Sequence, residues 1–223
     1  MRQTELRLYG VLGSSHSPGP TPIMSVSARN NLMIDQRSWS IASAAGFFLV
    51  LGFVASLAGV VMFMIRGGPS GGTPPSYTFF LWERSFFMAA VILTTIGFVL
   101  LEGRLQNTDG CVLGRTGATT YLIAGILLVT AEAFRMSLGE GFEKRAYALF
   151  VIYVVLAFLA QATIGGALLQ SGVLAAWIGW VTIVWNLGLL VVLSVITPED
   201  IYYPIAHQIM PLLIGGALLW RAP

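Results

Sequence analysis

Four charged residues lie inside apolar segments of this sequence, where charge is rare. Glu83 and Arg84 lie near the start of one apolar run, and Glu132 and Arg135 lie in the last third of the next. Ionisable residues inside membrane spans are costly and usually face the interior of a helix bundle, where they pair. Glu132 and Arg135 are three residues apart and can pair on one helix face. Glu83 and Arg84 are adjacent and point in different directions, so each needs a partner elsewhere. Crosswise pairs, Glu83 with Arg135 and Glu132 with Arg84, are geometrically allowed.

Three further polar residues of the later apolar runs join this candidate binding cluster: Asn186, Tyr203 and His207. His207 lies between two prolines of the last run, and prolines free backbone carbonyls that could line a site. We expect a structural hydrogen bond or an interfacial position for His207, with ligand binding or proton transfer as the alternative. Asn186 and Gln161 are of the kind that makes hydrogen bonds between membrane helices.

The sequence excludes several kinds of chemistry. One of its two histidines, His16, lies in the polar N-terminal segment, so a haem held by two histidines of one bundle is excluded. Lys144 lies at the boundary of an apolar run, whereas a retinal Schiff base needs a buried lysine. Cys111 is the single cysteine, too few for a zinc site of Cys and His ligands. No Walker, GxSxG or HExxH motif is present. We therefore assign no catalytic residue, metal or cofactor, and the net charge of +2 indicates no nucleic-acid partner.

Long apolar runs position these residues. The chain is 56% hydrophobic and 10% charged, with a mean hydropathy of +0.80, whereas a soluble domain carries about 25% charged residues. Uninterrupted runs of about 20 apolar residues satisfy their backbone hydrogen bonds in a membrane only as helices. The sequence therefore predicts an all-α, polytopic integral membrane bundle of about six helices. The predicted spans lie near residues 41–65, 79–101, 116–138, 146–169, 174–196 and 201–220.

The segments outside the spans are short, except at the N-terminus. Residues 1–40 are polar, contain no signal-peptide h-region and are predicted to form a disordered tail before the transmembrane domain, 41–223. Met24 and Met33 are alternative start sites. Ser171 and Gly172 predict a tight turn, so the fourth and fifth spans should form an antiparallel hairpin.

Six spans place the ends of odd spans and the starts of even spans on one side of the membrane. The four charged candidates then lie in one membrane half, together with Tyr203 and His207. If the N-terminus is cytoplasmic, the cytoplasmic side holds seven basic residues and the other side five: Arg2, Arg7, Arg29, Arg37, Arg104, Arg115 and Arg221 against Arg66, Arg84, Arg135, Lys144 and Arg145. The positive-inside rule therefore favours cytoplasmic N- and C-termini in the inner (cell) membrane.

The run from Gly166 to Trp180, GALLQSGVLAAWIGW, is followed by a proline-containing connector and a final apolar helix. This pattern resembles the C-terminal half of bacterial multi-pass proteins grouped as domains of unknown function, over about residues 165–220. In those proteins a Pro-x-Trp often follows the turn, whereas this chain has Ala175 or Ala176 at the place of the proline. The resemblance implies a six-helix bacterial inner-membrane protein, and it carries no activity to transfer.

The function predicted from these residues is that of a small binding, transport or accessory protein with a polar pocket in one membrane half. Its partners would be the lipid bilayer and a small-molecule or lipid ligand. A membrane-embedded enzyme acting on a lipid or isoprenoid is the first alternative, with Glu132 or Glu83 as general acid/base and His207 as partner. A structural subunit of a larger complex, or a homo-oligomer, is the second.

Overall fold

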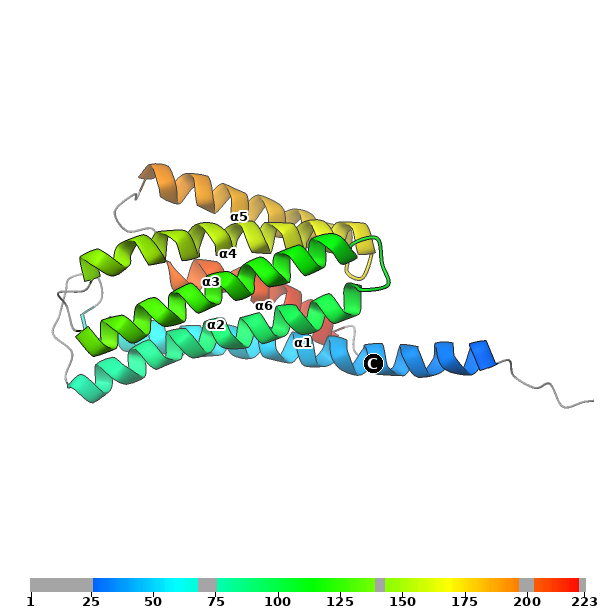
Figure 1. Cartoon of the computed structure of the whole chain (residues 1–223), viewed down its shortest axis with the longest axis horizontal. Coiled ribbons are helices and arrows are strands. Elements are labelled where there is room, and N and C mark those ends of the chain that lie inside the picture. Colours follow the sequence, from blue (N-terminus) through cyan, green and yellow to red (C-terminus); the bar gives the residue numbers. More distant parts are fainter. Residues whose placement is uncertain (1–25, 68–75, 139–142, 197–202, 221–223) are drawn as a thin grey trace, which may run out of the picture. The chain divides into compact units, whose positions relative to one another are not determined.

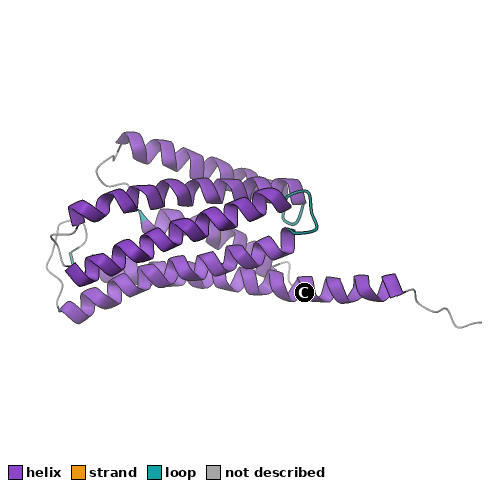
Figure 2. Ribbon diagram, in the orientation of Figure 1, coloured by secondary structure: helices purple, strands orange, loops and turns teal. Residues whose placement is uncertain are grey.

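All regular structure in the described residues is helical (Figure 2). The computed structural model describes residues 26–67, 76–138, 143–196 and 203–220. The chain divides into two compact units, Met1–Asp35 and Gln36–Pro223, and the second unit holds the bundle described below. The helices, labelled in Figure 1, are α1 (Val26–Ile65), α2 (Tyr77–Leu105), α3 (Cys111–Leu138), α4 (Glu143–Ser171), α5 (Ala176–Ile196) and α6 (Pro204–Trp220).

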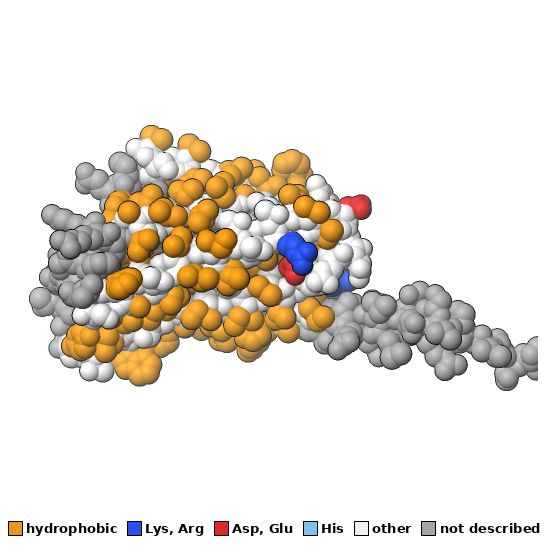
Figure 3. All heavy atoms as spheres, viewed as in Figure 1, with side chains coloured by type: hydrophobic (Ala, Val, Ile, Leu, Met, Phe, Trp, Pro, Cys, Tyr) orange, Lys and Arg blue, Asp and Glu red, His pale blue; other side chains and the backbone are white. Residues whose placement is uncertain are grey.

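The predicted fold class is confirmed: the protein is a multi-pass integral membrane helical bundle. By length and composition, five of the described helices can span a membrane: Ile41–Ile65 of α1, then α2, Cys111–Ser137 of α3, Tyr147–Ser171 of α4 and α5. The apolar α6 is shorter, at 17 residues. Hydrophobic side chains cover most of the visible face of the bundle in Figure 3. Among the exposed apolar side chains are Phe47 of α1 and Val184 of α5, as expected for surfaces that contact lipid tails.

The first predicted span, 41–65, matches the apolar part of α1, Ile41–Ile65, and α1 extends N-terminal to it. α1 begins at Val26, within the segment predicted as a tail over residues 1–40. Residues 1–25 lie outside the described residues, so the predicted disorder of the tail stays a prediction there.

The turn between α4 and α5 has the predicted form. Gly172 has a positive φ of 63°, the left-handed conformation that ends many helices and that glycine adopts without steric cost. The Ser171 hydroxyl donates to the Leu168 carbonyl and accepts from the Val173 N–H. The chain therefore reverses within a few residues, and α4 and α5 pack as an antiparallel hairpin, as predicted.

Small residues let the helix backbones approach closely. A Cβ added at Gly46 of α1 would lie 2.8 Å from the Gly215 carbonyl of α6, and one added at Gly179 of α5 would lie 2.8 Å from the Gly165 carbonyl of α4. Membrane helices gain their packing energy at such contacts because lipid tails are as apolar as the side chains that they replace. α6 thereby packs against α1, and it also contacts α2, α4 and α5.

α6 starts inside the bundle rather than level with the neighbouring helix ends. Gln208, the fifth residue of α6, hydrogen-bonds at 2.8 Å to Thr94, which lies 17 residues into α2. At about 1.5 Å of rise per residue, the start of α6 is recessed on the order of 10–20 Å from the start of α2. Figure 1 shows the same offset: at the left of the view, the start of α6 does not reach as far as α2 and α3.

Two side chains from other helices hydrogen-bond to the recessed part of α6. Pro211 has no N–H, so the His207 carbonyl four residues earlier lacks its helical partner. The Gln161 side-chain amide of α4 donates to that carbonyl at 3.0 Å. The Trp185 indole of α5 donates to the neighbouring Ala206 carbonyl at 3.2 Å. The proline thus creates an acceptor deep in the bundle, and α4 supplies its donor.

Candidate functional site

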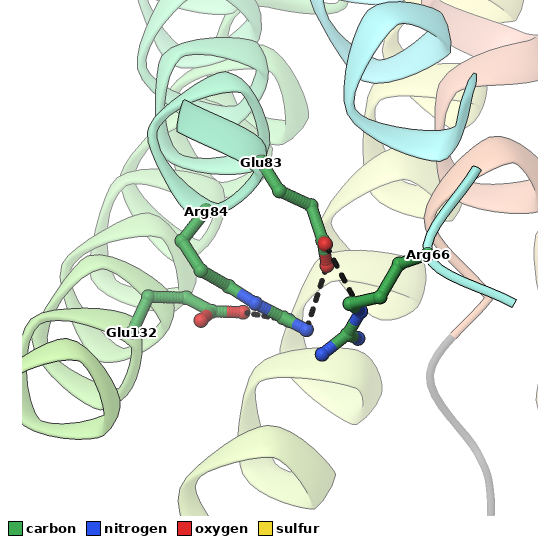
Figure 4. A network of polar contacts seen from close by, with 4 residues as sticks. All are labelled: Arg66, Glu83, Arg84 and Glu132. Carbon is green, nitrogen blue, oxygen red and sulfur yellow. Dashed lines mark hydrogen bonds and ion pairs between the residues drawn. The ribbon is translucent and has the colours of Figure 1, made fainter. Parts of the chain in front are cut away.

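A buried network of charges lies at the end of the bundle where α1 ends and α2 begins (Figure 4). Arg84 pairs with Glu83 at 2.9 Å and with Glu132 of α3 at 3.3 Å. Glu83 also pairs with Arg66, the residue after α1, at 3.2 Å. Glu83 and Glu132 are fully buried, and Arg84 is 4% exposed. The network therefore links α1, α2 and α3 in the part of the bundle where the sequence predicted a cluster.

The helix register explains why these residues meet. Glu83 lies six residues after the start of α2, and Glu132 lies six residues before the end of α3. Both carboxylates are therefore about 9 Å from the same end of an antiparallel helix pair, at about 1.5 Å per residue. Two glutamates at equal depth need cations at that depth, and Arg84 lies between them in Figure 4.

The crosswise pairing is confirmed for Glu132 and Arg84. The expectation that Glu83 and Arg84 point apart is wrong, because their side chains meet across the α2 surface at 2.9 Å. Long side chains can curl toward each other from adjacent helix positions when a third group, here Glu132, holds the guanidinium. Arg135 lies close enough to Glu132, Glu83 and Arg84 to interact with them electrostatically.

The sequence did not indicate Arg66 as a member of this network, and above it was counted only among the basic residues of one membrane side. Its guanidinium bonds to Glu83 and lies 5.3 Å from the Phe63 ring and 5.9 Å from the Phe80 ring. A signal was present: the end of an odd span and the start of an even span share one membrane side, so Arg66 and Glu83 had to be close in depth.

A cavity of about 650 Å³ lies beside this network. Arg84, Arg135 and Tyr203 are among its lining residues. The other lining residues are apolar or aromatic and come from α1, α2, α5 and α6: Val60, Phe63, Met64, Phe87, Trp185, Leu189, Pro204, Ile205, Ala206 and Ile209. The cavity therefore combines two cationic groups with extensive apolar walls.

The recessed start of α6 forms one boundary of this cavity. Residues 203–206, the N-terminal turn, are all lining residues, and the His207 N–H donates to the Tyr203 carbonyl. The N–H groups of a first helical turn lack intrahelical acceptors and carry the positive end of the helix dipole, about half a charge. Pro204 at the first helical position has no N–H, which leaves those of Ile205 and Ala206. Such a terminus favours an anion.

The environment of Arg84 leaves part of its hydrogen-bonding capacity unused. Its two terminal nitrogens face Glu83 and Glu132, and its guanidinium lies 5.3 Å from the Phe80 ring and 5.9 Å from the Phe87 ring. Its buried Nε has no hydrogen-bond partner among the described residues. Because a guanidinium carries five N–H donors, the two glutamates do not exhaust this group.

Two of the predicted site residues lie away from the cavity. His207 is fully buried, with its ring stacked on Phe158 at 4.1 Å and tilted against Tyr153 at 5.4 Å. Asn186 is fully buried and donates to the Thr182 carbonyl of its own helix at 2.7 Å. Neither is a lining residue of the cavity. The structure thus brings together Glu83, Arg84, Glu132 and Arg135, places Tyr203 at the same cavity, and leaves these two in the packed interior.

Within the described ranges, no group of three or more His, Cys, Asp or Glu side chains could hold a metal ion. The binding role of the predicted site residues stays a prediction. The orientation of the chain in the membrane and its location in the cell membrane also stay predictions. Comparison with known proteins found no matching family model, no similar curated protein and no similar solved structure.

Proposed function

We propose that this membrane protein binds an anionic amphipathic molecule in the cavity between α1, α5 and the start of α6. The observation that carries the proposal is the composition of the cavity wall: Arg84 and Arg135 in an otherwise apolar and aromatic lining. Ligand sites typically combine apolar walls with a few polar groups that fix the orientation of the ligand. Here those polar groups are cationic.

The charge of the network supports an anion as the ligand head. The described residues contribute three arginines, 66, 84 and 135, and two glutamates, 83 and 132, which leaves an excess of one positive charge. The N-terminus of α6 adds the positive end of its dipole. Arginine binds carboxylates and phosphates through charge-assisted hydrogen bonds, which are about twice as strong as neutral ones.

The apolar walls support a hydrocarbon tail. Val60, Phe63 and Met64 line one side on α1, and Leu189 lines another on α5. Met64 is 61% exposed, so the lining reaches the surface of the bundle. A lipid-soluble tail could therefore reach the walls from the bilayer while the head contacts the arginines.

The predicted alternatives receive less support. An enzyme that uses Glu83 or Glu132 with His207 needs that glutamate and His207 at one cavity, and His207 is stacked on Phe158 and does not line the cavity. A subunit role would need a partner surface, and nothing in the described residues distinguishes one from lipid-facing surface. The resemblance to bacterial six-helix proteins stays compatible with the proposal.

The test is photo-crosslinking of a long-chain carboxylate that carries a diazirine in its chain to the purified protein in phosphatidylcholine nanodiscs. We expect adducts on the lining segments of α1 and α6. Arg135→Gln should weaken labelling about tenfold, since losing one charge-assisted hydrogen bond of about 1.4 kcal/mol corresponds to that factor. The matched control is Arg115→Gln, at the opposite end of α3, where the side chain is 79% exposed. Equal labelling of both variants, or adducts only on the outer face of α5, would contradict the proposal.

A further inference from the structure

The size of the cavity limits the ligand that it can enclose. A volume of about 650 Å³ has room for roughly 20 nonhydrogen atoms, if each takes the ~30 Å³ that a water molecule occupies in the liquid. An acyl chain of about 16 carbons with a small head has about that many atoms, whereas a two-chain phospholipid has more than twice as many. The space therefore fits one hydrocarbon chain.

The position of the cationic groups limits the chemistry of the head. Arg84 is buried, lines the cavity and retains an Nε donor without a partner among the described residues. The N–H groups of Ile205 and Ala206 are in the first turn of α6, whose residues line the same cavity. These donors suit a group with two or more acceptor oxygens and a negative charge. A neutral alcohol has one oxygen and no charge, so it forms fewer and weaker hydrogen bonds with them.

From these two observations, and resting on the proposed function, we infer that the ligand is a single-chain amphiphile with a terminal oxyanion. Its head lies between Arg84, Arg135 and the N-terminus of α6, and its chain lies along the apolar residues of α1, α5 and α6. A carboxylate and a phosphate monoester present the same oxyanion chemistry. A diacyl lipid would have to leave its second chain outside the cavity.

Competition for radiolabelled palmitate bound to the full chain in phosphatidylcholine nanodiscs tests this inference. We expect both unlabelled palmitate and hexadecyl phosphate to displace the label, whichever of the two is the stronger competitor. Hexadecanol and dipalmitoyl phosphatidate should each be at least about tenfold weaker, because one lacks the charge and the other the fit. Displacement by the phosphatidate as strong as by palmitate would overturn the single-chain inference while leaving anion binding intact. Displacement by hexadecanol as strong as by palmitate would overturn the oxyanion head. Failure of every anionic amphiphile to bind would overturn the proposed function itself.

A variant that narrows the cavity supplies a second readout. Leu189→Trp adds volume to the α5 wall, so the preferred chain should become shorter by a few carbons in a series of carboxylates. Retained binding of the short members shows that the variant is folded. The matched control is Val191→Trp on the outer face of α5, where the side chain is 64% exposed, and its chain-length preference should stay that of the unmodified protein. An unchanged preference in Leu189→Trp would place the chain elsewhere and overturn the inference.

Discussion

Replacing Glu83 by glutamine tests whether the buried network holds the bundle together. The amide keeps an oxygen that can accept a hydrogen bond, so the change removes mainly the negative charge that faces Arg66 at 3.2 Å and Arg84 at 2.9 Å. The described network then has three arginines and one glutamate. A buried ion pair that loses one partner costs about 3–5 kcal/mol, and a charge at the centre of a membrane helix costs about 2.5–3.5 kcal/mol. We expect Glu83→Gln to lower the free energy of unfolding by about 3 kcal/mol.

Removing a positive charge, by Arg66→Gln, should change the free energy of unfolding less. Arg66→Gln leaves two arginines and two glutamates, and Arg66 lies at the end of α1, where its side chain is 14% exposed. We expect a loss of about 1 kcal/mol, the net contribution of one hydrogen bond, because Glu83 keeps Arg84 as a partner at 2.9 Å. Glu83→Gln should cost less in the Arg66→Gln background, because the excess of positive charge is then reduced.

The assay is reversible unfolding of the ligand-free protein in mixed micelles, followed by helix content. Glu102→Gln is the matched control. Its carboxylate lies 3.8 Å from the exposed Arg115 at the other end of the bundle, so it should change the free energy of unfolding by less than about 1 kcal/mol. The reasoning is refuted if Glu83→Gln changes stability no more than this control, or if Arg66→Gln is as damaging as Glu83→Gln.

Two further predictions concern the packing that positions the cavity. Gly179→Ala should lower the free energy of unfolding, measured by thermal melting, by about 1–3 kcal/mol. The added Cβ would lie 2.8 Å from a backbone carbonyl of α4. Gly188→Ala on the same helix, with nothing within 4 Å of the added Cβ, should be neutral or stabilising in the same melt. Gln161→Leu should cost about 1–2 kcal/mol in unfolding free energy by leaving the His207 carbonyl without its donor. That cost should shrink when Pro211→Ala restores a backbone N–H, and an equal cost in both backgrounds would contradict this account.

The helices themselves were predictable because run length and composition decide them in a membrane. α5, which contains no charged residue, was predicted over 174–196 and is found over Ala176–Ile196. The pair of Glu132 and Arg84 followed from depth, since antiparallel spans with charges near the same end must bring them together. The predicted turn at Gly172 followed from local chemistry alone.

The cavity could not be predicted because it depends on how far one helix is displaced along its neighbours. Residues 201–220 were expected to form a full span, and the described helix begins at Pro204, deep in the bundle. That displacement is fixed by contacts between residues far apart in sequence, such as Thr94 with Gln208. The prolines beside His207 indicated freed backbone carbonyls, but the sequence could not show that the donor to the His207 carbonyl would be Gln161 of α4.

The position of α6 also has a consequence for how the protein enters the membrane. α6 is shorter than the ~20 residues that a span needs, and it carries the buried polar residues His207 and Gln208 together with Pro211. An insertion machinery that selects segments by hydrophobicity retains such a helix weakly. Its hydrogen-bonding partners, Thr94 and Gln161, are synthesised earlier. We therefore expect insertion of α6 to depend on helices already in the bilayer, so that substitutions at Thr94 and Gln161 lower the yield of correctly inserted chains.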